Sequence, residues 1–211
     1  MDRDGLPFVL CPVAAAGILI AVGLWWSAGV FLILGGALGL FFRDPERHAP
    51  AGIGNDDVLA PADGLVIHAG DAEAPVSPEG EWIQISIFLS PLDVHVNRTP
   101  VGGHVVEVNY RPGRFLPAYD RRSAGENECA EVRIDHEGQI VIFRQVVGVL
   151  ARRVVCRVTP GMEVARGQRF GIMRFGSRMD VFLPRSAVVE VAVGEGVRGG
   201  ETVIGRLTGK L

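Results

Sequence analysis

The chain has 211 residues, enough for one ordinary domain with a hydrophobic core and an appendage. Its formal net charge of -3 at pH 7 gives no reason to expect affinity for nucleic acid, so nucleic-acid binding is excluded as a first hypothesis. The three cysteines, Cys11, Cys129 and Cys156, are odd in number and lack metal-ligand spacing, which argues against a disulfide framework and a zinc or other metal site. We expect small, buried apolar side chains at these positions.

The N-terminal part contains no charged side chain between Gly5 and Phe42. A membrane helix needs about 20 apolar residues, so one straight helix of this length would exceed the hydrocarbon core. The segment Trp25–Gly29 offers a place to turn, and we expect a membrane-associated hairpin within residues 1–48, with helices of about 18 and about 13 residues. A single span, a re-entrant hairpin and a surface insertion remain alternatives, whereas a cleaved signal peptide is disfavoured by the length of the stretch.

Residues 49–211 predict a β-rich globular domain, because short runs rich in β-branched residues alternate with Gly, Pro, Asp and Asn at turn positions. Residues 161–171 and 194–205 share the pattern Gly-x-x-Val-x-x-Gly and form a weak internal repeat. Paired glycine-punctuated hairpins resemble the halves of a barrel-sandwich module, in which glycines with positive φ make tight turns. We therefore expect a mainly β (α+β) fold with a barrel-sandwich-like domain.

Residues 111–128 have no strand pattern and are rich in arginine, and this length predicts either a functional loop or a mobile one. Bidentate contacts from such side chains would suit a phosphate or a carboxylate, although a solvated basic surface near anionic lipid explains them equally well. The candidates for binding a substrate headgroup are Arg111, Arg114, Arg121 and Arg122.

Gly176 and Ser177 interrupt the apolar stretch IMRFGSRMDVFLP, residues 172–184, which otherwise suits a buried strand. The strand-to-helix context of a serine-hydrolase nucleophile is absent. The acyl group nearest to the Ser177 hydroxyl is the carbonyl of Gly176, whose missing Cβ permits a strained backbone. Attack there would form an ester, and β-elimination of that ester would cut the chain and leave Ser177 as an N-terminal pyruvoyl group. A structural bulge is the alternative.

Residues 89–100, LSPLDVHVNRTP, would place Asp93, His95 and Asn97 on one face if the segment is extended. A histidine beside a carboxylate is a competent base near neutral pH, so His95 is the candidate for proton transfer, with a structural histidine as the alternative. Asp63 lies in PADG, residues 61–64, where a turn favours Asp-Gly for backbone reasons alone.

Four motifs, in order over almost the full length, resemble the short phosphatidylserine decarboxylase proenzymes: FFRDPER at 41–47, PADG, SPLDVHVNR at 90–98 and RFGSRMDVFLP at 174–184. The resemblance implies a pyruvoyl-dependent carboxy-lyase at the cytoplasmic face of the cell (inner) membrane. It would convert phosphatidylserine to phosphatidylethanolamine and CO₂ through a Schiff base on the pyruvoyl group. Self-cleavage between Gly176 and Ser177 would give a β chain, residues 1–176, and an α chain, residues 177–211, as a heterodimer that could dimerise further.

The resemblance also assigns roles to single residues. Ser177 would become the cofactor, Asp63 would support the self-cleaving base, and His95 would take part in the chemistry. Longer family members carry a second histidine where this chain has Arg98, so either His95 serves both maturation and decarboxylation or another group is the base. Two readings stay open: a non-enzymatic membrane-anchored β-barrel or lipoyl-like module, and a pyruvoyl-dependent decarboxylase of another amino acid.

Overall fold

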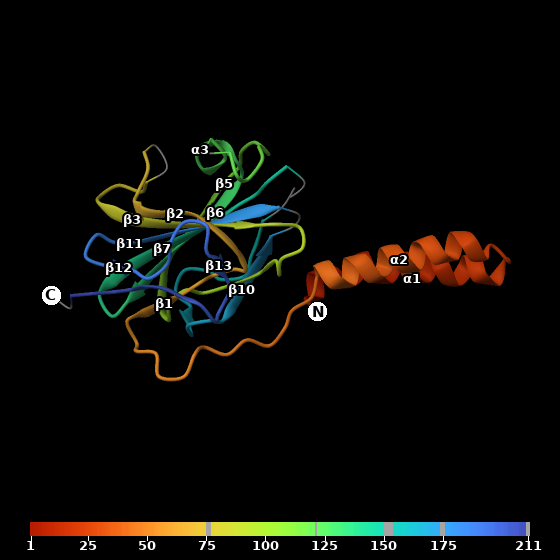
Figure 1. The fold of residues 1–211 in the computed structure, drawn as a ribbon, viewed down its shortest axis with the longest axis horizontal. Coiled ribbons are helices and arrows are strands. Elements are labelled where there is room, and N and C mark those ends of the chain that lie inside the picture. The colour runs from red at the N-terminus through yellow and green to blue at the C-terminus, as the bar shows by residue number, and fades with distance from the viewer. Residues whose placement is uncertain (75–76, 121, 150–153, 174–175, 210–211) are drawn as a thin grey trace. The chain divides into compact units, whose positions relative to one another are not determined.

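The computed structural model describes the whole chain except residues 75–76, 121, 150–153, 174–175 and 210–211. It consists of two compact units, Met1–Glu46 and Arg47–Leu211 (Figure 1). The sequence predicts the boundary between the helical and the β-rich part between residues 48 and 49.

The first unit is a helical hairpin. A 3-10 turn, η1 (Arg3–Gly5), leads into α1 (Leu6–Ala21), and α2 (Trp25–Phe41) lies alongside α1 (Figure 1). The chain reverses at residues 22–24, where Gly23 has a φ of +80° that other residues resist. The expectation that Trp25–Gly29 would form the turn was therefore wrong, since these residues begin the second helix.

The surface of this helical unit is strongly apolar. Trp26 and Ile33 are among the large apolar side chains that it exposes. The helical stretch Arg3–Ala21 is long and apolar enough to cross a membrane, whereas α2 is shorter. A surface of this kind is stable when lipid or protein covers it, which supports membrane association of this part of the chain.

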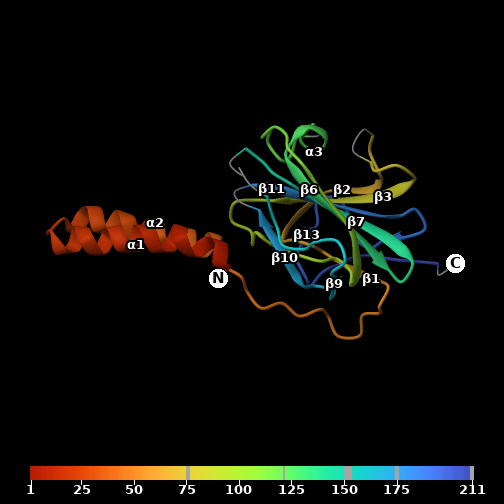
Figure 2. The ribbon, with the colours of Figure 1, turned by 180° about the vertical axis from the view of Figure 1, so that it is seen from behind.

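The second unit is built on a curled, antiparallel eight-stranded sheet (Figures 1 and 2). Its order is β13 (Gly196–Val197), β2 (Gly64–Asp71), β3 (Trp82–Leu89), β11 (Ser177–Pro184), β7 (Gln139–Val146), β6 (Cys129–His136), β5 (Gly103–Arg111) and β9 (Glu163–Val164). The one short helix, among the described residues of this unit, is α3 (Ser123–Glu126), which both views place beside β5 and β6.

Two three-stranded sheets enclose the core with the large one. One has the order β1 (Asp57–Leu59), β14 (Val203–Arg206), β12 (Val188–Val189), and the other β4 (Val96–Arg98), β10 (Arg169–Met173), β8 (Val154–Cys156). The core includes side chains from all three sheets, such as Phe143, Phe170 and Ile204. The expected mainly β, barrel-sandwich-like fold is confirmed.

The internal repeat is visible as two hairpins of the same design. Gly161 and Gly194 have φ of +90° and +91°, and Gly167 and Gly200 have φ of +76° and +77°. Each repeat supplies an edge strand of the large sheet, β9 or β13, and then the central strand of a small sheet, β10 or β14. The glycines are needed at these turns because positive φ is costly for other residues.

The cysteines differ from one another in environment. Cys129 is buried and Cys156 is half-buried, and burial raises the pKa of both thiols, so they behave as the expected apolar side chains. For Cys11 the expectation of burial was wrong, because its side chain is exposed on α1.

Candidate active site

Ser177 is the first residue of β11, at the centre of the large sheet, where it pairs with Leu89 of β3. Its side chain lies on the same face of the strand as those of Met179 and Val181, which belong to the core, so Ser177 points inward. The residue is completely buried, and its Oγ has no hydrogen-bond partner among the described residues. An unsatisfied buried hydroxyl costs about 1–3 kcal/mol, which makes this serine unusual for a purely structural residue.

Gly176 has a φ of +66°, and a Cβ added there would meet nothing within 4 Å. The need for glycine is therefore conformational and not spatial. For a residue with a Cβ, this left-handed conformation is less stable by about 1–2 kcal/mol. The unusual backbone that the sequence suggested lies directly before the buried serine.

Arg178 anchors the beginning of the same strand from the opposite face. Its Nε donates to Asp180 Oδ1 at 2.6 Å, and its Nη2 donates to Ser86 Oγ of β3 at 3.0 Å. All three residues are buried. A buried ion pair with a further hydrogen bond to the neighbouring strand restricts movement of β11 beside Ser177.

His95 lies in the connection that leads from β3 to β4, and it is completely buried. Its Nδ1 is 2.9 Å from the carbonyl oxygen of Asp93. Because a carbonyl only accepts, Nδ1 carries a proton, so in the uncharged form of the ring the lone pair is on Nε2, as a base requires. The carbonyl oxygen of His95 accepts from Met173 N at 3.3 Å, which ties the histidine to the last residue of β10 shortly before the Gly176–Ser177 bond.

The extended segment expected around His95 was wrong. The strand β3 ends at Leu89, a turn follows, and β4 begins only at Val96. The carboxylate of Asp93 accepts from Ser90 N at 2.7 Å and so caps this turn. The backbone carbonyl of Asp93, and not its side chain, is therefore the partner found for His95.

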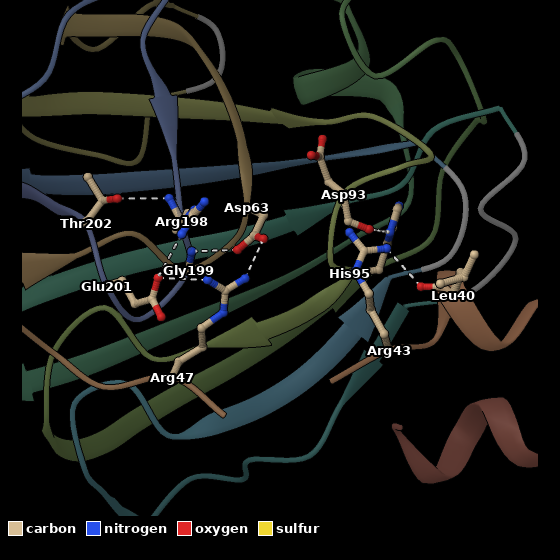
Figure 3. Close-up of polar contacts among 10 residues, drawn as sticks. All are labelled: Leu40, Arg43, Arg47, Asp63, Asp93, His95, Arg198, Gly199, Glu201 and Thr202. Atoms are coloured by element: carbon tan, nitrogen blue, oxygen red, sulfur yellow. Dashed lines mark hydrogen bonds and ion pairs between the residues drawn. The ribbon is translucent and has the colours of Figure 1, made fainter. Parts of the chain in front are cut away.

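Asp63 and His95 belong to two separate groups in Figure 3. The Oδ2 of Asp63 pairs with Arg47 Nη2 at 2.8 Å, and its Oδ1 accepts from Gly199 N at 2.8 Å. Arg47 also pairs with Glu201 at 2.8 Å. The structure thus places Asp63 at the turn of the second repeat, and a role in supporting the base stays a prediction.

Arg98, which the resemblance aligns with a second histidine of the longer family members, is buried next to the same turn. Its N–H donates to Pro61 O at 2.8 Å, and its Nη1 donates to Gly167 O at 3.1 Å. A Cβ on Gly200 would stand 2.8 Å from the Arg98 Cδ. Arg98 therefore lies between the turns of the two repeats, where its guanidinium supports the fold.

The arginines proposed to bind a headgroup have partners in the chain. Arg114 pairs with Glu126 at 3.2 Å, and Arg122 pairs with Asp120 at 2.8 Å and lowers the pKa of that carboxyl through a hydrogen bond. Arg111 donates to the carbonyl of Ala124 at 3.1 Å. Arg121 lies outside the described residues. Headgroup binding by these side chains stays a prediction.

An apolar pocket of about 230 Å³ lies beside the Gly176–Ser177 bond. Its lining consists of Phe88, Pro91, Pro117, Ala118, Tyr119, Val149 and Gly176. Phe88 and Tyr119 meet edge to face, with 6.0 Å between the ring centroids. Because Gly176 forms part of the wall, a molecule in this pocket contacts the residue that precedes Ser177.

The residue that holds the pocket loop was not among the candidates in the sequence. Asn127 is completely buried; its Oδ1 accepts from Leu116 N at 2.9 Å, and its Nδ2 donates to Leu116 O and Val147 O at 2.8 and 2.7 Å. The long loop of residues 112–128 is thereby fixed to the end of β7. No motif signals this role, although an asparagine in a long loop is a common source of backbone hydrogen bonds.

Two buried amides on strands of different sheets meet in the interior; of these, Gln145 was not a candidate in the sequence, and Asn97 was named only for its strand face. Gln145 Nε2 donates to Asn97 Oδ1 at 2.8 Å, while Asn97 Nδ2 and Gln145 Oε1 have no partner among the described residues. Gln145 pairs in register with Met179 on β11, on the core face that also carries Ser177. The interior near the serine therefore contains polar atoms that can bind water or a small polar group.

Comparisons with known proteins show which family the chain belongs to. The family model described as phosphatidylserine decarboxylase matches residues 35–205. Proteins named phosphatidylserine decarboxylase proenzyme are similar to this chain in Magnetococcus marinus (38% identity, 99% of this chain and 95% of the relative), in Pelodictyon phaeoclathratiforme (43%, 94% and 93%) and in Chlorobium phaeovibrioides (45%, 94% and 86%). The chain therefore belongs to the phosphatidylserine decarboxylase family.

Proposed function

We propose that this protein is a proenzyme that cuts itself between Gly176 and Ser177 and then decarboxylates phosphatidylserine to phosphatidylethanolamine. Family membership supports the activity and its dependence on a pyruvoyl group. The observation that carries the choice of bond is the combination of a left-handed Gly176 with a buried, unbonded Ser177 hydroxyl.

The proposed cut needs only groups of the chain and one water molecule. Ser177 Oγ attacks the carbonyl carbon of Gly176, its proton passes through a base to the amide nitrogen, and the C–N bond breaks to leave an ester. A base then removes the α-proton of residue 177, and the bond between Cβ of residue 177 and the ester oxygen breaks to leave Gly176 as a carboxylate. Water replaces the nitrogen of the resulting dehydroalanine, and ammonia leaves.

His95 is the candidate base, because its tautomer presents a lone pair on Nε2 and its backbone is bonded to Met173, close to the cut. The resulting pyruvoyl group supplies the electron sink that amino-acid decarboxylation requires. The buried position of residue 177 suits this chemistry, since it keeps bulk water from the reacting atoms.

The pocket beside Gly176 indicates which part of the lipid enters the protein. Sites that enclose a drug-sized ligand have volumes of about 300–1,000 Å³, and this pocket has about 230 Å³. It can take the glycerol region and the first carbons of a chain, but not two acyl chains. The rest of the lipid would remain in the bilayer, to which the apolar hairpin would attach the enzyme at the cytoplasmic face of the cell membrane.

An anionic headgroup would meet the arginines of the loop that also supplies Pro117, Ala118 and Tyr119 to this pocket. Of the three described, Arg111 is bonded to a neutral carbonyl and keeps its charge for a ligand, whereas Arg114 and Arg122 are paired with carboxylates. We propose Arg111 as the first contact with the phosphate or carboxylate of phosphatidylserine.

Intact-mass spectrometry of the purified protein tests the proposed function. The wild-type protein should contain a fragment of residues 177–211 that is lighter, by one ammonia, than the product of simple hydrolysis. Ser177→Ala should remain full length, while Ser186→Ala, at an exposed serine, should be cut normally. Liposomes containing phosphatidylserine should release CO₂ and free serine should not. A full-length chain with full decarboxylase activity would contradict the proposal.

A further inference from the structure

Gly148 follows β7 and lies against the bond proposed to be cut. Its φ is not positive, so its conformation is open to other residues. A Cβ at this position, however, would stand 2.0 Å from the carbonyl oxygen of Gly176 and 3.0 Å from its carbonyl carbon. No Cβ fits at such distances, so glycine is required here by the space that the Gly176 carbonyl occupies.

The backbone before Gly148 is not free to move away. Val147 N donates to Glu128 O at 3.1 Å, and Val147 O accepts from Asn127 Nδ2 at 2.7 Å. Asn127 is itself bonded twice to Leu116. Hydrogen bonds to both the N–H and the carbonyl of Val147 therefore fix the backbone that leads into Gly148.

The space for an added Cβ at residue 148 is limited further by Ala118, whose Cβ would lie 3.3 Å from it. Ala118 is buried, and its carbonyl accepts from Ser123 Oγ at 3.1 Å, which fixes the loop that carries it. A side chain at residue 148 would thus have to displace the Gly176 carbonyl, since its other neighbours are bonded in place.

We propose that Gly148 is a positioning residue for self-cleavage, and that its bare Cα is the surface on which the Gly176 carbonyl rests while Ser177 attacks. This inference rests on the proposed function. The step concerned is the first one, in which the bond from Ser177 Oγ to the Gly176 carbon forms and the bond from that carbon to the Ser177 nitrogen breaks. Asn127 supports the same geometry through Val147.

The contact also affects the atom that gains charge. During attack the Gly176 oxygen becomes an oxyanion, and the Cα–H bond of Gly148 that takes the place of a Cα–Cβ bond points toward it. Contacts between Cα–H and oxygen are weak, about 0.5–1 kcal/mol each, so most of the effect of Gly148 comes from orientation. Misplacement of reacting groups by about 1 Å is enough to cost roughly 100-fold in rate.

Gly148→Ala tests the inference, and Gly125→Ala is its matched control, since residue 125 is exposed in α3 and a Cβ there meets nothing within 4 Å. The full chain is made by cell-free synthesis, and release of residues 177–211 is followed on denaturing gels. We expect Gly148→Ala to cleave about 100-fold more slowly. Gly125→Ala should cleave at the wild-type rate, and both variants should show cooperative thermal unfolding.

Hydroxylamine identifies the blocked step, because it cleaves esters and leaves ordinary peptide bonds intact under mild conditions. It should release no additional fragment from Gly148→Ala, since the ester does not form. Release of the fragment by hydroxylamine would overturn the assignment to the first step, and cleavage of Gly148→Ala at the wild-type rate would overturn the whole inference.

A second variant tests the same geometry without adding an atom at residue 148. Asn127→Asp keeps the shape of the side chain but cannot donate to Val147 O, so cleavage should slow by about 10-fold in a chain that still unfolds cooperatively. If Gly148→Ala does not fold, an unchanged cleavage rate of Asn127→Asp overturns the inference. A wild-type chain that never cleaves would instead contradict the proposed function.

Discussion

Gly176→Ala is the substitution that measures how much the left-handed backbone contributes to maturation. An added methyl group meets nothing within 4 Å, so its effect comes only from φ, which is +66° at this residue. An alanine pays about 1–2 kcal/mol to keep this conformation. If it relaxes instead, the Gly176 carbonyl turns away from Ser177 and the conformation that reacts is less populated.

The expected rate follows from this cost. If the reactive conformation of the alanine variant is less stable by about 1–2 kcal/mol, cleavage slows by roughly 5- to 30-fold. The assay is cell-free synthesis of the chain, quenching at intervals, and quantification of the full-length band and of the fragment with residues 177–211 on denaturing gels.

Gly194→Ala is the matched control for backbone strain. Gly194 has a φ of +91°, and a Cβ there also meets nothing within 4 Å, but it lies in the turn of the second repeat and not at the bond. It should lower the free energy of unfolding by a similar amount while cleavage stays at the wild-type rate. Cleavage of Gly176→Ala as fast as wild type would refute the reasoning.

Three further predictions concern the base, the fold and the pocket. His95→Gln should remain full length on denaturing gels, whereas the control His68→Gln should be cleaved as wild type is. Normal cleavage of His95→Gln would exclude His95 as the base. The Arg206 guanidinium lowers the pKa of Asp57 through a hydrogen bond. The Asp57 carboxylate therefore stabilises the fold above its pKa in the unfolded chain, and this contribution is lost as pH falls through its pKa in the folded protein. Asp57→Asn should lower the free energy of urea unfolding at neutral pH, and the difference from wild type should shrink below about pH 4. A difference that does not change with pH would contradict this. Val149→Trp narrows the pocket and should raise KM for phosphatidylserine liposomes several-fold, unlike Val188→Trp on β12; an unchanged KM would show that substrate does not use the pocket.

The sequence and the structure agree most closely where a property is local. The repeat pattern Gly-x-x-Val-x-x-Gly predicted tight hairpins, and the four glycines of its two copies have nearly identical positive φ. Periodicity failed around His95, because the carboxylate of Asp93 bonds to Ser90 N and closes a turn that alternation of residue types does not reveal. The turn of the helical hairpin was misplaced for a similar reason, since Gly23 marks the reversal better than the tryptophans do.

The sequence by itself determined the mainly β fold, the apolar N-terminal helices, the family and the proposed Gly176–Ser177 bond, because composition, glycine positions and motif order are properties of neighbouring residues. Only the tertiary structure decided what surrounds that bond. Gly148, Asn127 and the pocket come together because β6, β7 and β11 pair side by side, which brings residues from three separate segments to one end of the sheet. Such contacts depend on strand register and on space between backbones, and no single segment of the sequence carries that information.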